Sequence, residues 1–193
     1  PSTSIDHGDP SNANLFSAFF KNAVSLGERP LLFHKKRGKW IGTTWNDVAD
    51  SIKRLSGALV AAGVQPRDRV MICAENRPEW AIADLAIMAI GAIVVPAYTT
   101  NTEDDHVYIM EHSGAVVIIT SGGILGNRVA LAASRVPNIR MLITMDPHTE
   151  VPDLAPTTIY TWQSLMKSTE PLDDIDARIY AQNADDVCCF VYT

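Results

Sequence analysis

The sequence predicts an α/β fold in which a parallel β-sheet is flanked by helices on both faces. Four short apolar runs alternate with segments of helical periodicity, namely 69–74, 92–95, 115–120 and 139–144. Strands that are apolar along most of their length are typical of a sheet buried on both faces. Because a strand, a helix and a second strand form a right-handed crossover within one sheet, these three βαβ units predict four parallel strands that are neighbours or near neighbours.

An N-terminal helix and a β-hairpin are expected before the βαβ units. Apolar residues recur at helical spacing over 15–23, which predicts an amphipathic helix. Two strand-like runs, 31–34 and 39–43, flank a short basic turn and predict a hairpin. Thr44 and Asp47, three residues apart, predict a capping box that starts the next helix.

Local signals set the ends of the helices between the strands. Gly63 and Gly114 each follow a helical pattern, so we expect them to adopt the left-handed conformation that ends a helix. Asn76, followed by Pro78, predicts the N-cap of a helix that runs to about residue 90. Thr102 opens the next helix, which carries three acidic residues in its first turn.

The C-terminal part is less regular. A helix is predicted over 127–135, and Pro147, Pro152 and Pro156 then indicate a long irregular segment. The last apolar run, 186–192, predicts another strand of the buried type.

The bulk composition is that of one globular domain. The chain has 193 residues, of which 47% are hydrophobic and 20% charged, as in ordinary packed proteins. We expect residues 15–193 to form this domain behind a flexible leader of residues 1–14. The leader does not resemble a signal peptide. The longest apolar run, 86–97, is well short of the ~20 residues that a membrane-spanning helix needs.

Charge and cysteine content exclude several classes of protein. Sixteen basic and 22 acidic residues give a net charge of -6, which disfavours nucleic acid as a partner because its phosphates attract basic surfaces. The three cysteines form no CxxC pair, so they suggest neither a disulfide framework nor a zinc site. A reducing cytoplasm is the compartment that fits.

One glycine-rich segment has the layout of a dinucleotide site. Ser121, Gly122, Gly123 and Gly126 follow a predicted strand and precede a helix, and Asp146 comes after the next strand. In such sites glycines let the backbone approach a pyrophosphate, and an acid binds a ribose hydroxyl. Because Ser121 stands where the first glycine belongs, an ordinary strand-to-helix turn is the alternative interpretation.

The remaining chemically active side chains are better explained as structural groups. Glu103, Asp104 and Asp105 are consecutive on a helix and point about 100° apart, so they favour dipole complementation over a metal site. His106 and His112 are six residues apart, which is the wrong spacing for a two-histidine ligand face. We interpret them as capping or partly buried histidines.

Adjacent cysteines and several aromatic residues are expected in the core. Cys188 and Cys189 face opposite sides of a predicted strand and are interpreted as small core residues. Aromatic side chains in strand or helix patterns are interpreted as packing groups, including Trp40, Trp45, Trp80 and Phe190. On residue chemistry alone, the sequence shows no complete catalytic constellation.

Three regions nevertheless resemble the adenylate-forming superfamily, the acyl-CoA synthetases and their relatives. The first is Thr44-Trp45-Asn46-Asp47-Val48, similar to the motif T-[YW]-x-[ED]-[LV], with its helix ending in 55–59. The second comprises Asn76-Arg77-Pro78-Glu79-Trp80 and 90–100, similar to long-chain fatty acyl-CoA synthetases, and 108–115 extends it. The third is 185–193, which looks like the strand that leads into the phosphate loop Y-T-S-G-T-T-G-x-P-K-G.

The resemblance implies the incomplete N-terminal domain of an adenylate-forming fold and a two-step ligase reaction. A fatty acid carboxylate would attack the α-phosphate of Mg-ATP, and coenzyme A would then displace AMP to form the thioester. Only Thr193, which matches the first threonine of the phosphate loop, carries over as an ATP contact. The family's other contacts come later in the chain, so this piece is expected to be inactive and to bind no cofactor alone.

The implied partners are a long-chain fatty acid and the remainder of the synthetase. Peripheral membrane contact and self-association stay open. Two alternatives to a ligase piece also stay open: a dinucleotide-binding oxidoreductase domain that uses 121–126, and a non-catalytic interaction module with the same fold.

Overall fold

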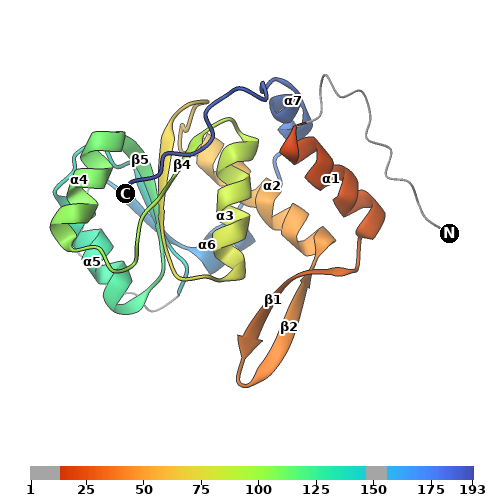
Figure 1. Cartoon of the computed structure of the whole chain (residues 1–193), viewed down its shortest axis with the longest axis horizontal. Helices are drawn as coiled ribbons and strands as arrows, with labels where there is room; N and C mark the ends of the chain where they lie inside the picture. The colour runs from red at the N-terminus through yellow and green to blue at the C-terminus, as the bar shows by residue number, and fades with distance from the viewer. Residues whose placement is uncertain (1–13, 147–155) are drawn as a thin grey trace.

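The computed structural model describes residues 14–146 and 156–193, so the predicted leader lies outside the described residues except for Asn14. Figure 1 shows the arrangement of the elements along the chain. The N-terminal half contains α1 (Leu15–Leu26), β1 (Pro30–Lys36), β2 (Lys39–Thr44), α2 (Trp45–Ala61), β3 (Arg69–Cys73), α3 (Pro78–Ala89) and β4 (Ile93–Pro96). The C-terminal half contains α4 (Glu103–Ser113), β5 (Ala115–Thr120), α5 (Gly123–Ser134), β6 (Met141–Thr144), β7 (Thr158–Thr161), α6 (Trp162–Ser168) and α7 (Ile175–Tyr180).

A five-stranded parallel sheet forms the centre of the molecule. Its order is β4-β3-β5-β6-β7, and every neighbouring pair is parallel. The four strands predicted from the apolar runs are therefore confirmed as neighbours in one sheet. β1 and β2 pair antiparallel in a separate two-stranded sheet, which confirms the predicted hairpin.

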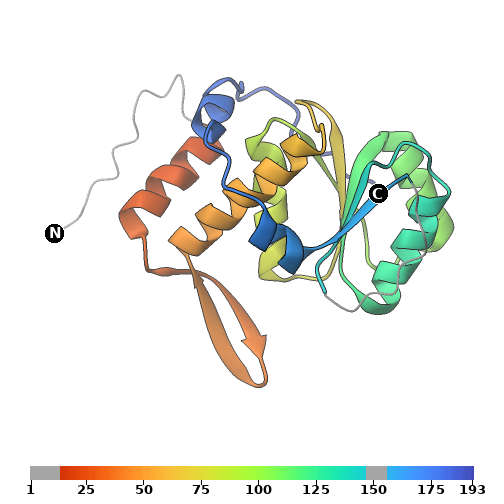
Figure 2. The ribbon, with the colours of Figure 1, turned by 180° about the vertical axis from the view of Figure 1, so that it is seen from behind.

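Helices cover both faces of the sheet, as predicted. One buried cluster joins one face to α1, α2, α3, α6 and α7, and a second joins the other face to α4 and α5. Figure 2 shows the same layers from behind. The strands are buried on both sides: every residue of β5 and β6 is buried. Within the described ranges no helix is long and apolar enough to cross a membrane.

Most helix ends follow the local signals. Thr44 with Asp47 and Thr102 with Asp105 form complete capping boxes, and Gly114 ends α4 in the left-handed conformation with φ 65°. The prediction of Asn76 as an N-cap is wrong by one residue. The N-cap of α3 is Arg77, whose side chain makes no capping bond because a guanidinium has no hydrogen-bond acceptor; it binds carboxylates instead.

The region after residue 156 is more regular than predicted. β7 adds a fifth strand to the sheet, and α6 and α7 pack on the larger core cluster through Leu165, Ile175 and Ile179. These elements have four, seven and six residues, too few to show a clear period in the sequence. Pro147 and Pro152, which predicted an irregular segment, lie outside the described residues.

Candidate functional site

The carboxyl edge of the sheet is the place where an open α/β fold binds ligands, at the point where strand order reverses. Here the chain passes from β3 to β4 in one direction across the sheet, and from β5 to β6 in the opposite direction. The strand order therefore reverses between β3 and β5. Three polar side chains follow the carboxyl ends of adjacent strands: Glu75 after β3, Ser121 after β5 and Asp146 after β6. They define the candidate site by position.

Arg77 holds the acidic groups of this edge together. Its Nη1 donates to both carboxylate oxygens of Asp146 at 3.0 and 3.1 Å. Its Nε and Nη2 donate to the carboxylate of Glu79 at 2.9 and 3.2 Å. Ser121, which is buried, donates its hydroxyl proton to the carboxylate of Glu75. Each of these carboxylates thus has a hydrogen-bond partner within the chain, and one arginine among three carboxylates leaves the edge with a net negative charge.

Asp146 also supplies the anion at the start of α5. The backbone N–H of Gly122, the N-cap of that helix, donates to Asp146 Oδ2 at 2.8 Å. A helix N-terminus favours negative charge and exposes unpaired N–H groups. This capping starts α5 at Gly123, four residues earlier than the predicted start at 127. Asp146 therefore lies where a bound phosphate would sit in a dinucleotide site.

The dinucleotide interpretation of Ser121, Gly122, Gly123 and Gly126 loses its support in this geometry. The predicted strand, loop and helix are present, but Ser121 and Asp146 bond to other residues of the chain. Gly123 has φ 61°, and nothing lies within 4 Å of the position where its Cβ would be. The backbone conformation of the turn is enough to explain this glycine.

The acidic first turn of α4 is structural, as predicted. Glu103 and Asp104 accept hydrogen bonds from Arg135 Nη1 at 2.9 and 2.8 Å. The hydroxyl and backbone N–H of Thr102 hold the pKa of Asp105 below its ordinary value. Among the described residues, no group of three or more His, Cys, Asp or Glu side chains could hold a metal ion.

His106 and Cys73 form a buried pair without the charges that nucleophilic catalysis needs. His106 Nε2 lies 3.9 Å from Cys73 Sγ. Burial lowers the pKa of His106 and raises the pKa of Cys73 to about 12, so both groups are neutral at pH 7. A reactive cysteine requires a thiolate. His112 is exposed, stacks on Tyr108 and lies 2.9 Å from the hydroxyl of Tyr192.

The segment 187–193 runs along the free edge of β4. Val94 donates its N–H to Cys188 O, and Phe190 donates its N–H to Val94 O, both at 2.9 Å. The segment pairs with β4 only through the parallel bridge between Val94 and Cys189. The prediction of a strand buried on both faces is wrong, because Val187 is 58% and Val191 67% exposed.

Four side chains that were interpreted as core or packing groups are exposed. Cys188 and Cys189 are free and exposed, not core residues. Trp40 and Phe190, interpreted as packing groups, are also exposed, whereas Trp45 and Trp80 are partly buried as expected. Thr193 is exposed at the end of the segment, and its role as an ATP contact stays a prediction.

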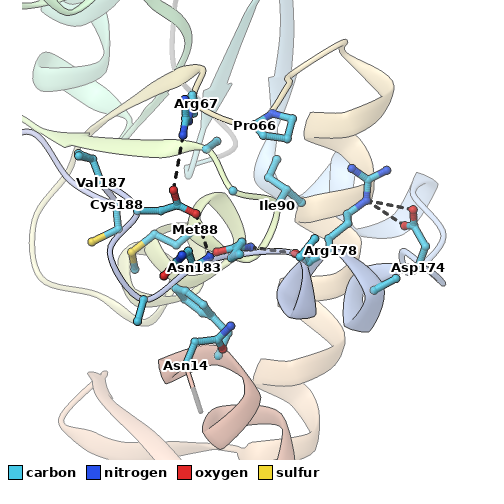
Figure 3. Close-up of a pocket in the computed structure, with 18 residues that line it drawn as sticks. Asn14, Pro66, Arg67, Met88, Ile90, Asp174, Arg178, Asn183, Val187 and Cys188 are labelled. Carbon is cyan, nitrogen blue, oxygen red and sulfur yellow. Dashed lines mark hydrogen bonds and ion pairs between the residues drawn. The ribbon is translucent and has the colours of Figure 1, made fainter. Parts of the chain in front are cut away.

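A cavity of about 680 Å³ lies at the opposite, amino end of β4 (Figure 3). Its apolar wall includes Phe16, Met88, Ile90 and Val187. The charged side chains that line it pair with one another: Arg67 with Asp186 at 3.6 Å, and Arg178 with Asp174 at 3.0 Å. These two ion pairs include every charged side chain that lines the cavity.

The hydrogen-bonded side chains at this edge, Glu75, Arg77, Glu79, Ser121 and Asp146, form a carboxyl-edge network. The sequence did not predict that Glu75 and Arg77 belong to it. A signal was available, since Glu75 directly follows the apolar run that became β3 and Arg77 comes two residues later. The network itself depends on Asp146, which is 69 positions from Arg77 in the chain. Only the strand order brings them together.

Comparison with known proteins identifies the fold and the family. Residues 19–193 match the family described as AMP-binding enzyme. The chain is 30% identical over 156 residues to the long-chain-fatty-acid--CoA ligase FadD15 of Mycobacterium tuberculosis, covering 81% of this chain and 25% of that protein. It is 26% identical over 178 residues to the long-chain-fatty-acid--CoA ligase ACSBG2 of Gallus gallus, covering 90% of this chain and 23% of that protein.

Solved structures show the same fold. A benzoate CoA ligase from Burkholderia xenovorans LB400 superimposes with a TM-score of 0.74 at 22% identity, covering 93% of this chain and 32% of that one. The adenylation domain of a carboxylate reductase from Mycobacterium chelonae gives 0.74 at 16% identity, covering 96% and 33%. The chain thus spans about a quarter of the length of the two ligase relatives named above. It has the fold of the N-terminal domain of adenylate-forming enzymes, and it belongs to the AMP-binding enzyme family.

Proposed function

We propose that this chain forms the N-terminal part of an ATP-dependent long-chain fatty acid:CoA ligase. The observation that carries the proposal is the family match over residues 19–193, together with relatives that are long-chain-fatty-acid--CoA ligases. In the proposed reaction, the acyl carboxylate attacks the α-phosphate of ATP and releases pyrophosphate. The thiolate of coenzyme A then attacks the acyl carbonyl and releases AMP.

The contribution of this chain would be a rigid framework, with the reacting groups supplied by the rest of the ligase. Its described polar clusters are paired internally, and its buried cysteine and histidine are neutral. The segment 187–193, which runs along the edge of β4, carries exposed apolar side chains. We propose that the remainder of the ligase covers these side chains and that Thr193 begins the ATP phosphate contact. The isolated chain would then be inactive.

In the described part of the chain, no group of three or more His, Cys, Asp or Glu side chains could hold a metal ion. Mg²⁺ that accompanies a nucleotide usually takes only one or two carboxylates together with phosphate oxygens and water, and we propose that the rest of the ligase supplies them. ATP and coenzyme A enter the proposal as substrates. A cytoplasmic location is proposed from the three free cysteines, since reduced thiols are usual there. Self-association of the chain is proposed only through surfaces that the rest of the ligase would otherwise cover.

The direct test is substrate-dependent AMP formation by the intact product of the gene that encodes this chain. We expect AMP and acyl-CoA to form with C12 to C18 fatty acids and coenzyme A, and much more slowly with benzoate. Residues 1–193 alone should show no acid-dependent exchange of pyrophosphate into ATP. Turnover with benzoate but not with palmitate would contradict the long-chain assignment, and acid-dependent exchange by residues 1–193 would contradict the framework role.

Thr193 can be tested separately in the intact product. Thr193→Ala should lower kcat/KM for ATP by about tenfold, since one hydrogen bond to a charged group is worth about 1.5 kcal/mol. Thr158→Ala is the matched control because Thr158 is an exposed threonine in β7. Equal kinetics for the two variants would remove Thr193 from the ATP site.

A further inference from the structure

The β1–β2 hairpin extends away from the body of the molecule in both views (Figures 1 and 2). Its base is anchored, because Leu31 and Leu32 pack against the larger core cluster. Its outer part is not covered by the described chain: Phe33 is 59% and Trp40 69% exposed. Large aromatic side chains rarely remain this exposed without a binding partner.

The turn at the end of the hairpin is well defined. Lys36 pairs with Lys39, so the loop has two residues, Arg37 and Gly38. Their φ angles are 49° and 81°, as in the two-residue turns that match the natural twist of a hairpin. The two strands therefore stay paired as far as the turn, and the side chains near it are held close together.

The same end of the hairpin is strongly basic. Lys35, Lys36, Arg37 and Lys39 are all exposed, and none of them belongs to an ion pair among the described residues. Residues 30–44 include no acidic side chain, although the chain as a whole has a net charge of -6. The positive charge is thus concentrated on one projection of an acidic protein.

One basic side chain, Lys35, shares a face of the hairpin with two aromatic side chains, whereas Lys36 and Lys39 project from the opposite face. Lys35 is paired with Trp40, and Phe33 with Gly42. Directly paired residues of antiparallel strands point to the same side, and so do residues two positions apart. Phe33, Lys35 and Trp40 therefore project together. The Phe33 ring lies across Gly42, where a Cβ would come within 3.3 Å of it.

From this arrangement we infer that the hairpin end, residues 33–41, docks on an anionic lipid surface. Tryptophan is enriched at the boundary between lipid and water, and clustered Lys and Arg bind acidic headgroups. An apolar protein surface packed on the face of Phe33 and Trp40 would bury Lys35 without a partner, which is costly. A lipid surface accepts the aromatic rings and leaves the cations among headgroups and water. The inference depends on the hairpin alone and not on the proposed ligase activity.

The experiment is sedimentation of the intact gene product with vesicles of phosphatidylcholine, with and without 30% phosphatidylglycerol. We expect binding to the anionic vesicles only, and loss of binding in 1 M NaCl, where the screening length falls to about 3 Å. Lys35→Gln with Lys36→Gln should weaken binding roughly 25-fold, at about fivefold per cation. Trp40→Ala should weaken it while preserving the preference for anionic vesicles.

The control variant removes two positive charges from a part of the surface outside the hairpin. Lys21→Gln with Lys167→Gln changes two exposed lysines on α1 and α6, and it should leave binding unchanged. Circular dichroism verifies that each variant is folded. Equal binding by the two double variants, equal binding to neutral vesicles, or no vesicle binding would overturn the inference. Shielding of Trp40 from an aqueous quencher without lipid would also overturn it, because another protein surface would then cover the hairpin.

Discussion

Charged side chains at the carboxyl edge of the sheet have partners within the described part of the chain, whereas those at the end of the β1–β2 hairpin do not. At the sheet edge, Arg77 lies between Asp146 and Glu79, and each charged group has a partner within the chain. At the end of the hairpin, four neighbouring cations have no ion-pair partner in the described chain and stand beside exposed aromatic rings. The difference separates a polar network that stabilises the domain from a surface available to something outside it.

The largest expected difference in unfolding free energy is between a substitution in the buried sheet and one in the exposed segment 187–193. Leu142→Ala in β6 removes a side chain that is fully buried between the sheet and its helices. It should lower the free energy of unfolding by about 3 kcal/mol through lost burial and a cavity. Val191→Ala, at a site 67% exposed, should change it by less than about 0.5 kcal/mol. Urea denaturation of both variants measures this, and equal effects would mean that the end segment is packed like the core.

The next prediction compares two arginines. Arg77→Gln leaves Asp146 and Glu79 without their shared cation, and we expect a loss of about 1.5 kcal/mol in unfolding free energy. Arg178→Gln removes one i,i+4 ion pair, between a partly buried arginine and the exposed Asp174, and should cost about 0.3 to 0.5 kcal/mol. Thermal unfolding at pH 7 distinguishes the two. An Arg77 effect no larger than that of Arg178 would show that the carboxyl-edge network is not stabilising.

A smaller effect is expected from Asp84 on α3, whose pKa burial raises from 3.8 to about 6. Because the folded state binds this proton more tightly than the unfolded state, stability should fall as pH rises from about 4 through 6. Asp84→Asn should remove that slope and raise stability at pH 7 by about 1 kcal/mol, after allowance for partial exposure. Little change is expected at pH 3.5.

The control for this titration is Asp173→Asn, at an exposed aspartate. Unfolding free energies of the three proteins between pH 3.5 and 8 give the comparison. An unchanged pH slope in Asp84→Asn would mean that this carboxyl is hydrated in the folded protein.

Much of the fold was predictable because its signals are local. The apolar runs that became β3, β4, β5 and β6 are each bounded by turn or capping residues, and Thr44, Thr102 and Gly114 act at their own helix ends. β7, α6 and α7 were not predictable in this way. Each is too short to show a period, and each is stabilised by packing on distant elements rather than by its own sequence.

The candidate site was less predictable for a similar reason. Asp146 looked like a ribose-binding acid because it follows a strand at a familiar spacing from Ser121. In the structure it caps α5 and binds Arg77, a partner 69 positions away. Exposure was also misjudged at Trp40, Cys188 and Cys189, because an apolar pattern predicts which residues share a face and not whether anything covers that face.

Amide hydrogen exchange tests most directly the claim that the interior is self-sufficient while the hairpin end and residues 187–193 need outside partners. We expect β5 and β6 to exchange slowest both in residues 1–193 alone and in the intact gene product. Exchange of residues 187–193 should be slower in the intact product than in residues 1–193 alone, and exchange of residues 35–40 should slow further when anionic vesicles are added. Full protection of both segments in residues 1–193 alone would contradict the account.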